Sequence, residues 1–320
     1  MAVHELVPTI DIADPTAADL AALDEACRLH GFFLLAGHGL DELIAATWRE
    51  TEHFFGADRS VRTAVGRDAD NPLGWFDREL TKRRRDHKEV FDFIDPSVSD
   101  RDQHNRWPDQ ATLPHFRPTM LAFFDAFSDL AERTAAVVLG ALGLDDANGF
   151  AGDRHNSTVR LNHYPLGDPV PGNERDGLAD LGETALGYHT DPGVLTLLLQ
   201  DDTGGLQART AAGEWIDVPP RAGTIVVNLA DAMQVWTNDR YCAAVHRVTT
   251  MTERNRYSIP YFSNPSRSTS IAPIAALADQ PRYREFLWRD YMRARTEDNY
   301  EDLGADDAQI TDYLIGSASP

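Results

Sequence analysis

The sequence predicts a mainly β protein whose core is a β-barrel or sandwich with helices packed around it. Amphipathic helical patterns dominate the first half of the chain, short β-branched runs follow one another after Asn156, and one more helical pattern lies near the C-terminus. The 320 residues are therefore expected to form one domain. Its parts would be a helical N-terminal layer over 1–150, a β core over 151–265, and a C-terminal helix and tail over 266–320.

The N-terminal layer is expected to alternate between strands and helices. The segment VPTIDI predicts a short strand, and Thr16 is the expected N-cap of a first helix that Gly31 ends. A buried strand in GFFLLAGHGL and a second helix in DELIAATWRETEHFF follow.

The longest helix is expected from Pro118 to Leu144, and a further helix around Arg282 to Arg295. Residues 58–109 are polar and are expected to be irregular, with the basic run 82–85 in a solvated loop. The acidic tail, 297–312, is expected to act as a lid or a packing arm.

The β core is expected to consist of eight short strands. Each is rich in β-branched, aromatic or aliphatic residues and is separated from the next by Gly, Asp, Asn or Pro, which favour turns. In chain order the runs are STVRLNHY, GYHTD, GVLTLLLQ, GGLQART, EWIDV, GTIVVNL, AAVHRVTT and RYSIPYF. Strands at this spacing are typical of an all-β sandwich or barrel.

The composition limits the kind of protein. A net charge of −21 argues against binding nucleic acid or an anionic membrane, because both attract basic surfaces. No apolar run approaches the roughly 20 residues that span a bilayer, and the N-terminus lacks a signal-peptide pattern. The two cysteines, Cys27 and Cys242, are too far apart in sequence for a CxxC metal site and too few for a disulfide scaffold. We expect a soluble, cytoplasmic and monomeric protein that acts on a small molecule.

Two metal-capable side chains open an otherwise apolar strand in the stretch LGYHTDPGVLTLLL. His189 and Asp191 are two residues apart, so on a strand both point to the same face and form a chelating pair. Of the eleven histidines, His246 lies in a later core strand with small or apolar neighbours. Two histidines and one carboxylate form the facial triad of non-haem Fe(II). The alternative for each residue alone is a role in packing.

A candidate anion site follows ten residues after His246. Arg256 and Ser258 open the run RYSIPYF, and 250–255 is the expected turn of an antiparallel hairpin with the strand of His246. In that register both side chains face the same interior as His246. A buried arginine is costly unless it meets an anion, and a guanidinium beside a hydroxyl suits a carboxylate. We expect a ligand carboxylate here; the alternative is a pair between Arg256 and an acidic residue of the chain.

The order His189-x-Asp191, His246, Arg256-x-Ser258 resembles the iron- and 2-oxoglutarate-dependent dioxygenases of the isopenicillin N synthase-like family. The resemblance spans nearly the whole chain, from Val7 to about Asn264. Further segments similar to landmarks of that family are VPTIDIAD, HGFFLLAGHGL, KEVFDF, Trp107-Pro108-Asp109, VRLNHYP and TNDRYCAAVHRV.

The resemblance implies a fold and a metal. The fold would be a double-stranded β-helix, the jelly roll of cupin-like proteins. Residues 1–150 would correspond to the N-terminal region of non-haem dioxygenases, and 151–265 to the catalytic core. The three residues of the triad would hold Fe(II).

The resemblance also implies a cosubstrate and a reaction. Arg256 and Ser258 would pair with the far carboxylate of 2-oxoglutarate, and Asn162 and Tyr164 would add hydrogen bonds to it. In the family, O2 is consumed, 2-oxoglutarate becomes succinate and CO2, and the substrate is hydroxylated, desaturated or cyclised. Asp191 stands where related halogenases have a small residue, which favours these reactions over halogenation.

The substrate is less defined. Phe262 continues the inward alternation of its strand, Leu206 is a candidate by its position in the family, and Arg85 is a candidate from the basic run. An amino-acid-derived substrate or one from secondary metabolism is expected from the family alone.

Two alternatives remain open from the sequence. One is an iron oxidase of the same fold that needs no 2-oxoglutarate, as in isopenicillin N synthase or aminocyclopropane-carboxylate oxidase. The other is a jelly-roll binding module without catalysis that has kept a metal site.

Overall fold

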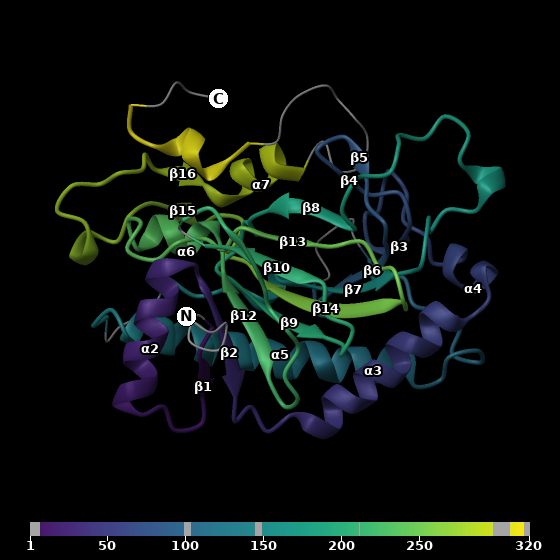
Figure 1. The fold of residues 1–320 in the computed structure, drawn as a ribbon, viewed down its shortest axis with the longest axis horizontal. Coiled ribbons are helices and arrows are strands. Elements are labelled where there is room, and N and C mark those ends of the chain that lie inside the picture. Colours follow the sequence, from purple (N-terminus) through teal and green to yellow (C-terminus); the bar gives the residue numbers. More distant parts are fainter. Residues whose placement is uncertain (1–6, 99–103, 145–148, 211, 297–307, 317–320) are drawn as a thin grey trace.

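The core of the computed structural model is two β-sheets that face one another (Figure 1). The eight-stranded sheet has the order β1-β2-β12-β9-β14-β7-β6-β3, and the four-stranded sheet has the order β11-β10-β13-β8. The residues that the structure describes are 7–98, 104–144, 149–210, 212–296 and 308–316.

The strands of the eight-stranded sheet are β1 (Thr9–Asp11), β2 (Phe32–Ala36), β3 (Gly74–Phe76), β6 (Glu89–Ile94), β7 (Thr158–Tyr164), β9 (Leu195–Gln200), β12 (Ile225–Leu229) and β14 (Arg256–Ser263). Those of the four-stranded sheet are β8 (Leu186–His189), β10 (Leu206–Arg209), β11 (Trp215–Asp217) and β13 (His246–Val248). Two small pairs are β4 (Leu80–Thr81) with β5 (Arg84–Arg85), and β15 (Ser270–Ile271) with β16 (Phe286–Leu287). The helices are α2 (Ala17–Leu29), α3 (Asp41–Gly56), α4 (Arg59–Thr63), α5 (Phe116–Gly140), α6 (Asp231–Trp236) and α7 (Trp288–Thr296).

The two faces of the eight-stranded sheet differ because successive side chains on a strand point to opposite sides. On β9, Leu195, Leu197 and Leu199 belong to the large apolar core, whereas Thr196 and Leu198 line a cavity between the sheets. One face of the sheet is therefore committed to packing, and the other is available for chemistry.

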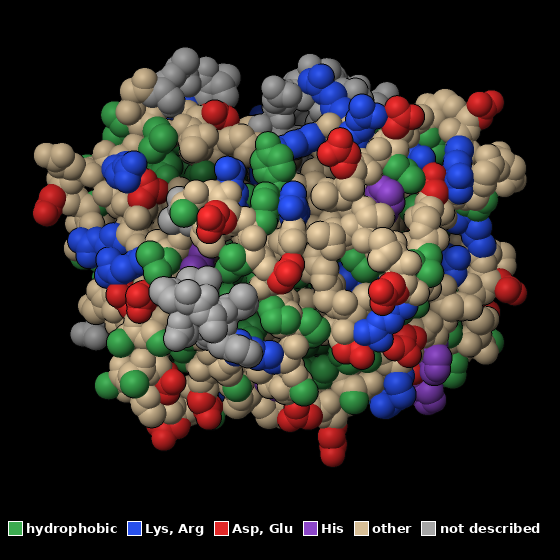
Figure 2. All heavy atoms as spheres, in the orientation of Figure 1, with side chains coloured by type: hydrophobic (Ala, Val, Ile, Leu, Met, Phe, Trp, Pro, Cys, Tyr) green, Lys and Arg blue, Asp and Glu red, His purple; other side chains and the backbone are tan. Residues whose placement is uncertain are grey.

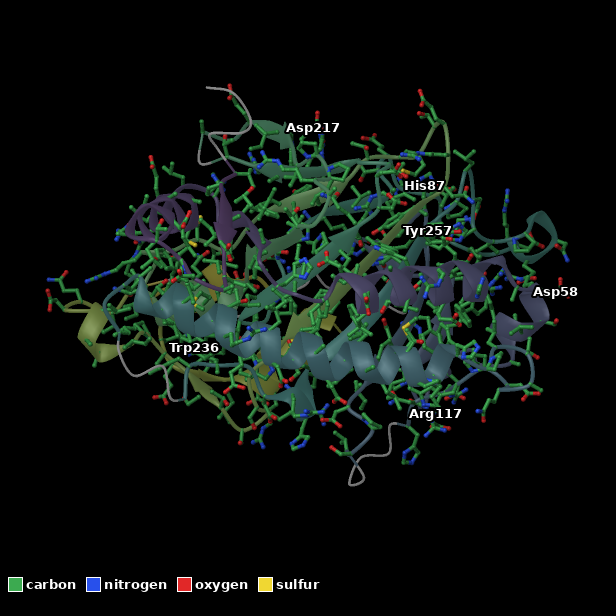
Figure 3. The ribbon with its side chains drawn as sticks, turned by 90° about the horizontal axis from the view of Figure 1, so that it is seen from below. Asp58, His87, Arg117, Asp217, Trp236 and Tyr257 are labelled. Carbon is green, nitrogen blue, oxygen red and sulfur yellow. The ribbon has the colours of Figure 1, made fainter. Side chains whose placement is uncertain are left out.

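The helices α3 and α5 cover the packing face, as Figure 3 shows from below. The ring of Phe54 on α3 stacks on Phe116 of α5 with centroids 5.0 Å apart. Phe124 of α5 meets Tyr261 of β14 at 5.5 Å. The inward stripe of α5 is thus aromatic and fixes the helix against the middle of the sheet.

A smaller apolar cluster closes one end of the space between the sheets. Phe32, Leu34 and Val226 of the eight-stranded sheet pack against Leu206 and Ala208 of β10. This packing holds the sheets together at that end and leaves the cavity beside it.

Most sequence predictions of elements are confirmed. All eight predicted runs of the β core contain strands, and the three N-terminal helices form. Thr16 caps α2 as expected: its hydroxyl accepts from the backbone N–H of Asp19, whose carboxylate accepts from the N–H of Thr16. No described helix is long and apolar enough to cross a membrane.

The expectation that 58–109 is irregular was wrong. Strands β3 and β6 extend the eight-stranded sheet, and β6 pairs along its whole length with β7. β3 has only three residues, and Glu89 and Asp92 interrupt the apolar residues of β6. Asp92 is tolerated inside the sheet because it is paired with Arg160 of β7. The N-terminal layer therefore contributes four strands to the eight-stranded sheet as well as helices, and the division of the chain into three parts stays a prediction.

The basic run is only partly solvated. Lys82 and Arg83 form the turn between β4 and β5 with φ angles of 51° and 63°, which suits a two-residue hairpin turn. Arg85 is buried. On the face shown in Figure 2, acidic and basic side chains of the described residues are interspersed without one large block of either sign.

The expected hairpin of β13 and β14 does not form. β13 pairs with β8 and β10, whereas β14 pairs with β7 and β9. The connection crosses from one sheet to the other, so His246 and Arg256 line the same cavity from opposite sheets. The two strands are adjacent in sequence, which suggested that they pair, but each belongs to a different sheet.

The C-terminal helix begins later than expected, at Trp288, because β16 occupies the residues before it. Most of the acidic tail, 297–307, lies outside the described residues. After it, Ala308 and Ile310 pack against the large core.

Candidate active site

The three predicted metal ligands lie close together where strand β8 ends and strand β13 begins. In the antiparallel pair of β8 and β13, His189 lies directly opposite His246, and Asp191 follows β8 by two residues. Asp191 Oδ1 is 3.6 Å from His189 Nε2 and 3.9 Å from His246 Nε2. One potential ligand atom from each residue lies within 4.8 Å of the others, a spacing at which one ion can touch all three.

Both histidines have the same ring nitrogen occupied. Nδ1 of His189 lies 2.8 Å from the carbonyl oxygen of Gly187, and Nδ1 of His246 lies 2.9 Å from that of Ala244. A carbonyl oxygen only accepts, so each Nδ1 carries the proton and each Nε2 keeps its lone pair for a metal.

Asp191 is oriented in the same way. Its Oδ2 accepts hydrogen bonds from the Thr196 hydroxyl at 2.5 Å and from the Asn228 amide at 2.8 Å. Oδ1 is left facing the two imidazoles. Thr196 and Asn228 sit opposite one another on β9 and β12, so the middle of the eight-stranded sheet positions a ligand that belongs to the other sheet.

The electrostatics of the triad favour metal binding. Burial lowers the pKa of His246 to about 4, and His189 acts in the same direction. Burial alone would raise the pKa of Asp191, but His246, His189 and the Thr196 hydroxyl outweigh it and hold this pKa well below its usual range. A neutral imidazole beside an ionised carboxylate is the state that binds a divalent cation.

The predicted anion site lies across the cavity on β14 and β7. Arg256 is opposite Tyr164, and Ser258 is opposite Asn162. Arg256 is 1% exposed; its Nε donates to the carbonyl of Gly204 at 2.7 Å, and its guanidinium lies 4.9 Å from the ring of Tyr164. Within the described residues, neither Nη1 nor Nη2 has a hydrogen-bond partner.

The neighbours of Arg256 leave polar atoms open as well. The Asn162 amide donates to Ser258 Oγ at 3.3 Å, while Asn162 Oδ1 is buried without a partner in the described chain. A buried guanidinium with two open nitrogens is costly unless an anion meets it. The residues therefore fit a dicarboxylic cosubstrate that bridges the triad and Arg256.

One cavity of about 910 Å³ joins these parts. The triad, Arg256, Ser258, Asn162 and Tyr164 all line it, as do the predicted pocket residues Leu206 and Phe262. The volume falls in the range of small-molecule sites.

Arg85 is not among the residues that line this cavity, so the structure corrects the expectation for it. Its Nη1 and Nη2 each donate to an oxygen of Asp168 at 2.9 Å, and its Nε donates to the carbonyl of Ala179. This arginine fastens the 168–182 segment to β5 instead of meeting a ligand.

Sequence reasoning missed two sets of cavity residues. One is a group of buried charges on and before β6 and on β7, where the KEVFDF segment carried a partial signal. The other is helix α7, which lines the cavity with Trp288, Met292 and Arg295. No local pattern marks α7 as part of the site.

Helix α7 also touches the metal-ligand segment. Arg295 Nη2 donates to the carbonyl of Thr190, which lies between His189 and Asp191, at 3.0 Å. Tyr291 donates to the buried carboxylate of Asp231 at 2.6 Å, and the N–H of Asp231 donates to the carbonyl of Asp191. The helix thus supports the segment that carries two of the three predicted ligands.

Comparisons with known proteins agree with this geometry. The family model of the 2OG-Fe(II) oxygenase superfamily matches residues 155–265, and that of the non-haem dioxygenase in morphine synthesis N-terminal region matches 7–110. Gibberellin 2-beta-dioxygenase 1 of Arabidopsis thaliana is 30% identical over 298 residues, 90% of this chain and 88% of that protein. This chain belongs to the 2OG-Fe(II) oxygenase superfamily.

Other similar proteins extend the match. The 2-oxoglutarate-Fe(II) type oxidoreductase hxnY of Emericella nidulans is 32% identical over 305 residues, 86% of this chain and 83% of its own length. The crystal structure of a full-length Neurospora crassa protein in complex with alpha-KG matches with a TM-score of 0.76 at 26% identity, covering 89% of this chain and 94% of that chain. JOX2 in complex with 2OG, Fe and JA matches with a TM-score of 0.75 at 26% identity, over 89% and 83%.

The oxygenase therefore has the predicted jelly-roll core, and it uses Fe(II), 2-oxoglutarate and O2. The predictions of family, fold class, enzyme class and cofactors are confirmed.

Proposed function

We propose that this oxygenase hydroxylates a C–H bond of a small organic molecule, with His189, Asp191 and His246 as the iron ligands. Fe(II) with 2-oxoglutarate and O2 supplies the oxidising power, and 2-oxoglutarate becomes succinate and CO2. The chain binds, orients and shields the reactants. Because the proposed ligand Asp191 stands where related halogenases have a small residue, we propose hydroxylation and not halogenation.

The observation that carries this proposal is the open guanidinium of Arg256 in the same cavity as a preoriented triad. In our proposal, Arg256 and Ser258 bind the far carboxylate of 2-oxoglutarate, and Asn162 and Tyr164 support them. The ring of Tyr164, which lies 4.9 Å from the Arg256 guanidinium, keeps water away from this ion pair, and the exclusion of water strengthens it.

The comparisons support a small-molecule substrate. Relatives carry names such as feruloyl CoA ortho-hydroxylase and scopoletin 8-hydroxylase, and solved neighbours hold thymine or JA. An amino-acid-derived or secondary-metabolite substrate, a cytoplasmic location and a monomeric state stay predictions.

The test is turnover of the full chain reconstituted with Fe(II), measured as succinate formed from 2-oxoglutarate together with O2 consumed. Arg256→Ala is expected to raise the KM for 2-oxoglutarate by about 10- to 100-fold, because a charge-assisted bidentate contact is lost. Arg254→Ala is the matched control, since Arg254 is half exposed and pairs with Asp202.

Each outcome has a distinct meaning. O2 consumption without succinate would support the oxidase that needs no 2-oxoglutarate. Iron binding without any O2 consumption would support the non-catalytic binding module. An unchanged KM in Arg256→Ala would remove Arg256 from the cosubstrate site.

A further inference from the structure

A group of buried charges forms one wall of the cavity, on the side of β6 and β7. Four of them, Glu79, Asp86, Lys88 and Asp92, are each at most 5% exposed, and Arg160 of β7 is the fifth. All five line the cavity. We call this group the charged wall. Burying a charged side chain costs free energy unless an opposite charge or a hydrogen-bonding group meets it.

Two of the three carboxylates in the charged wall are fully matched. Arg160 donates to both oxygens of Glu79 at 2.9 Å and to both oxygens of Asp92 at 2.7 Å. Arg67 donates to Glu79 as well. These contacts give every oxygen of the two carboxylates a hydrogen-bond donor, so Glu79 and Asp92 are fully paired within the chain.

Asp86 differs from the other two carboxylates. Its Oδ2 accepts from the Thr81 hydroxyl at 3.1 Å and lies 3.3 Å from Lys88 Nζ. Among the residues that the structure describes, its Oδ1 has no hydrogen-bond partner. Asp86 is 3% exposed and lines the cavity, so the open oxygen belongs to a buried side chain of the cavity lining.

Lys88 lies next to Asp86 and supplies a hydrogen-bond donor beside it. Its ammonium lies 3.2 Å from Glu79 and 3.3 Å from Asp86. An ammonium carries three protons, so two carboxylates leave one N–H to donate. Asp86 and Lys88 therefore offer an acceptor and a donor side by side.

The charges indicate what kind of group fits there. Three cations, Arg67, Lys88 and Arg160, face three carboxylates, Glu79, Asp86 and Asp92, so the formal charges of these six side chains balance. A charged group would upset this balance in a medium that screens poorly. A neutral group with one donor and one acceptor would fill both open positions and leave the balance unchanged.

We propose that Asp86 and Lys88 bind the substrate by a neutral amide-type edge, whose N–H donates to Asp86 Oδ1 and whose C=O accepts from Lys88. This inference rests on the proposed function and names the substrate class of the same site. Leu198 and Phe262 of the eight-stranded sheet and Leu206 and Val248 of the four-stranded sheet give the cavity an apolar part. Another part is lined by charged residues, which are Arg267, Arg289, Asp290, Arg293 and Arg295.

The experiment compares lactams with two matched sets of compounds. The full chain is loaded with Fe(II) and 2-oxoglutarate, and succinate release is measured with a panel of substituted lactams, their N-methyl derivatives and the lactones of the same ring. A lactam presents N–H and C=O on one edge. N-methylation removes the N–H donor and keeps the C=O acceptor, and the lactone has an ester oxygen in place of the N–H.

We expect lactams to stimulate succinate release and to exceed their N-methyl and lactone partners by about tenfold or more in kcat/KM, the effect of a hydrogen bond to a charged group. This comparison uses the unmodified protein and does not depend on the folding of a variant. Asp86→Ala is expected to remove the preference for lactams, and Asp180→Ala, an exposed residue paired with Arg84, is expected to keep it.

The result that would overturn the inference is equal stimulation by lactams, N-methyl lactams and lactones, or stimulation by none of them. If the protein still binds Fe(II) and 2-oxoglutarate and turns over with compounds outside the lactam set, the proposed function stands and this inference fails. If no succinate forms under any condition, the proposed function fails with it.

Discussion

At the scale of residues, the triad is held by hydrogen bonds that leave one ligand atom free on each side chain. The carbonyls of Gly187 and Ala244 fix the two imidazoles, and Thr196 with Asn228 fixes Asp191. Because each ligand is oriented before a metal arrives, less conformational entropy is lost on binding.

Replacing Asn228 tests this orientation. In Asn228→Ala, Oδ2 of Asp191 loses one of its two donors, and we expect the affinity for Fe(II) to fall by about 10- to 100-fold. The measurement is an anaerobic Fe(II) titration of the metal-free protein. Asn173→Ala, at an exposed position, is the control. Equal affinity in the two variants would show that Thr196 alone orients the carboxylate.

At the scale of elements, helix α7 joins two parts of the site. It lines the cavity with Trp288 and Met292, and through Arg295 it holds the carbonyl of Thr190 in the ligand segment. A change in the position of α7 would therefore reach the metal ligands directly.

Removing this contact should weaken the metal site without removing a ligand. We expect Arg295→Ala to lower the affinity for Fe(II) by about tenfold, and Arg295→Lys to recover part of the loss, because an ammonium can still donate to the carbonyl. The same titration measures it, with Arg282→Ala as the control, because Arg282 is exposed, pairs with Asp239 and does not line the cavity. A variant that binds Fe(II) as tightly as the unmodified protein would contradict this role.

At the scale of the whole molecule, the eight-stranded sheet separates packing from chemistry. Leucines of β9 on one face pack under α5, and residues on the other face line the cavity. Substitutions on the packing face should therefore reduce stability and leave cosubstrate binding unchanged.

Leu197→Ala is the test of that separation. Leu197 is fully buried, and we expect its truncation to lower the free energy of unfolding by about 2–5 kcal/mol. Leu166→Ala, at a half-exposed position, should change it by about 0.5 kcal/mol or less. Urea unfolding measures both values. A large loss of 2-oxoglutarate affinity in folded Leu197→Ala would contradict the separation of the two faces.

The charged wall predicts a dependence of stability on pH. Burial raises the pKa of Asp86, and Glu79 acts in the same direction, whereas Lys88 and the Thr81 hydroxyl oppose it. Between the unfolded value, about 3.9, and the raised folded value, the native state holds more protons than the unfolded chain. Stability therefore falls as pH rises through this window, and the ionised Asp86 disfavours the fold above it.

Asp86→Asn should consequently lose this part of the pH dependence, because an amide does not titrate in this range. Between about pH 4 and pH 7, its melting temperature should fall less with rising pH than that of the unmodified protein. Melting curves across this range measure it, with Asp180→Asn as the exposed control. The same slope in Asp86→Asn and in the unmodified protein would contradict the raised pKa of Asp86.

The sequence allowed candidate ligands to be named, but not their surroundings. His189, Asp191, His246 and the Arg256–Ser258 pair have fixed spacings, which a single chain displays. Asn228 and Thr196 approach Asp191 only through strand pairing, and α7 reaches Thr190 from more than a hundred residues away. Such contacts depend on tertiary packing, which has no local pattern.

The same limit explains the errors in the fold. Short β-branched and apolar runs between turn residues identified the eight strands from β7 to β14, but β13 and β14 pair with strands distant in sequence and not with one another. Strand β6 was missed because Glu89 and Asp92 interrupt its apolar residues, and the partner of Asp92, Arg160, lies on the neighbouring strand β7. Arg85 was placed in the pocket because its partner, Asp168, could not be foreseen.

The central claim is that one cavity holds Fe(II) on the triad and 2-oxoglutarate between the triad and Arg256. The most direct measurement is an anaerobic optical titration of the metal-free protein with Fe(II) and then 2-oxoglutarate, with His189→Ala and Arg256→Ala alongside. We predict a visible charge-transfer band that appears only after 2-oxoglutarate is added. It should be absent in His189→Ala and require a much higher 2-oxoglutarate concentration in Arg256→Ala. Fe(II) binding without that band, or an unchanged band in both variants, would contradict the claim.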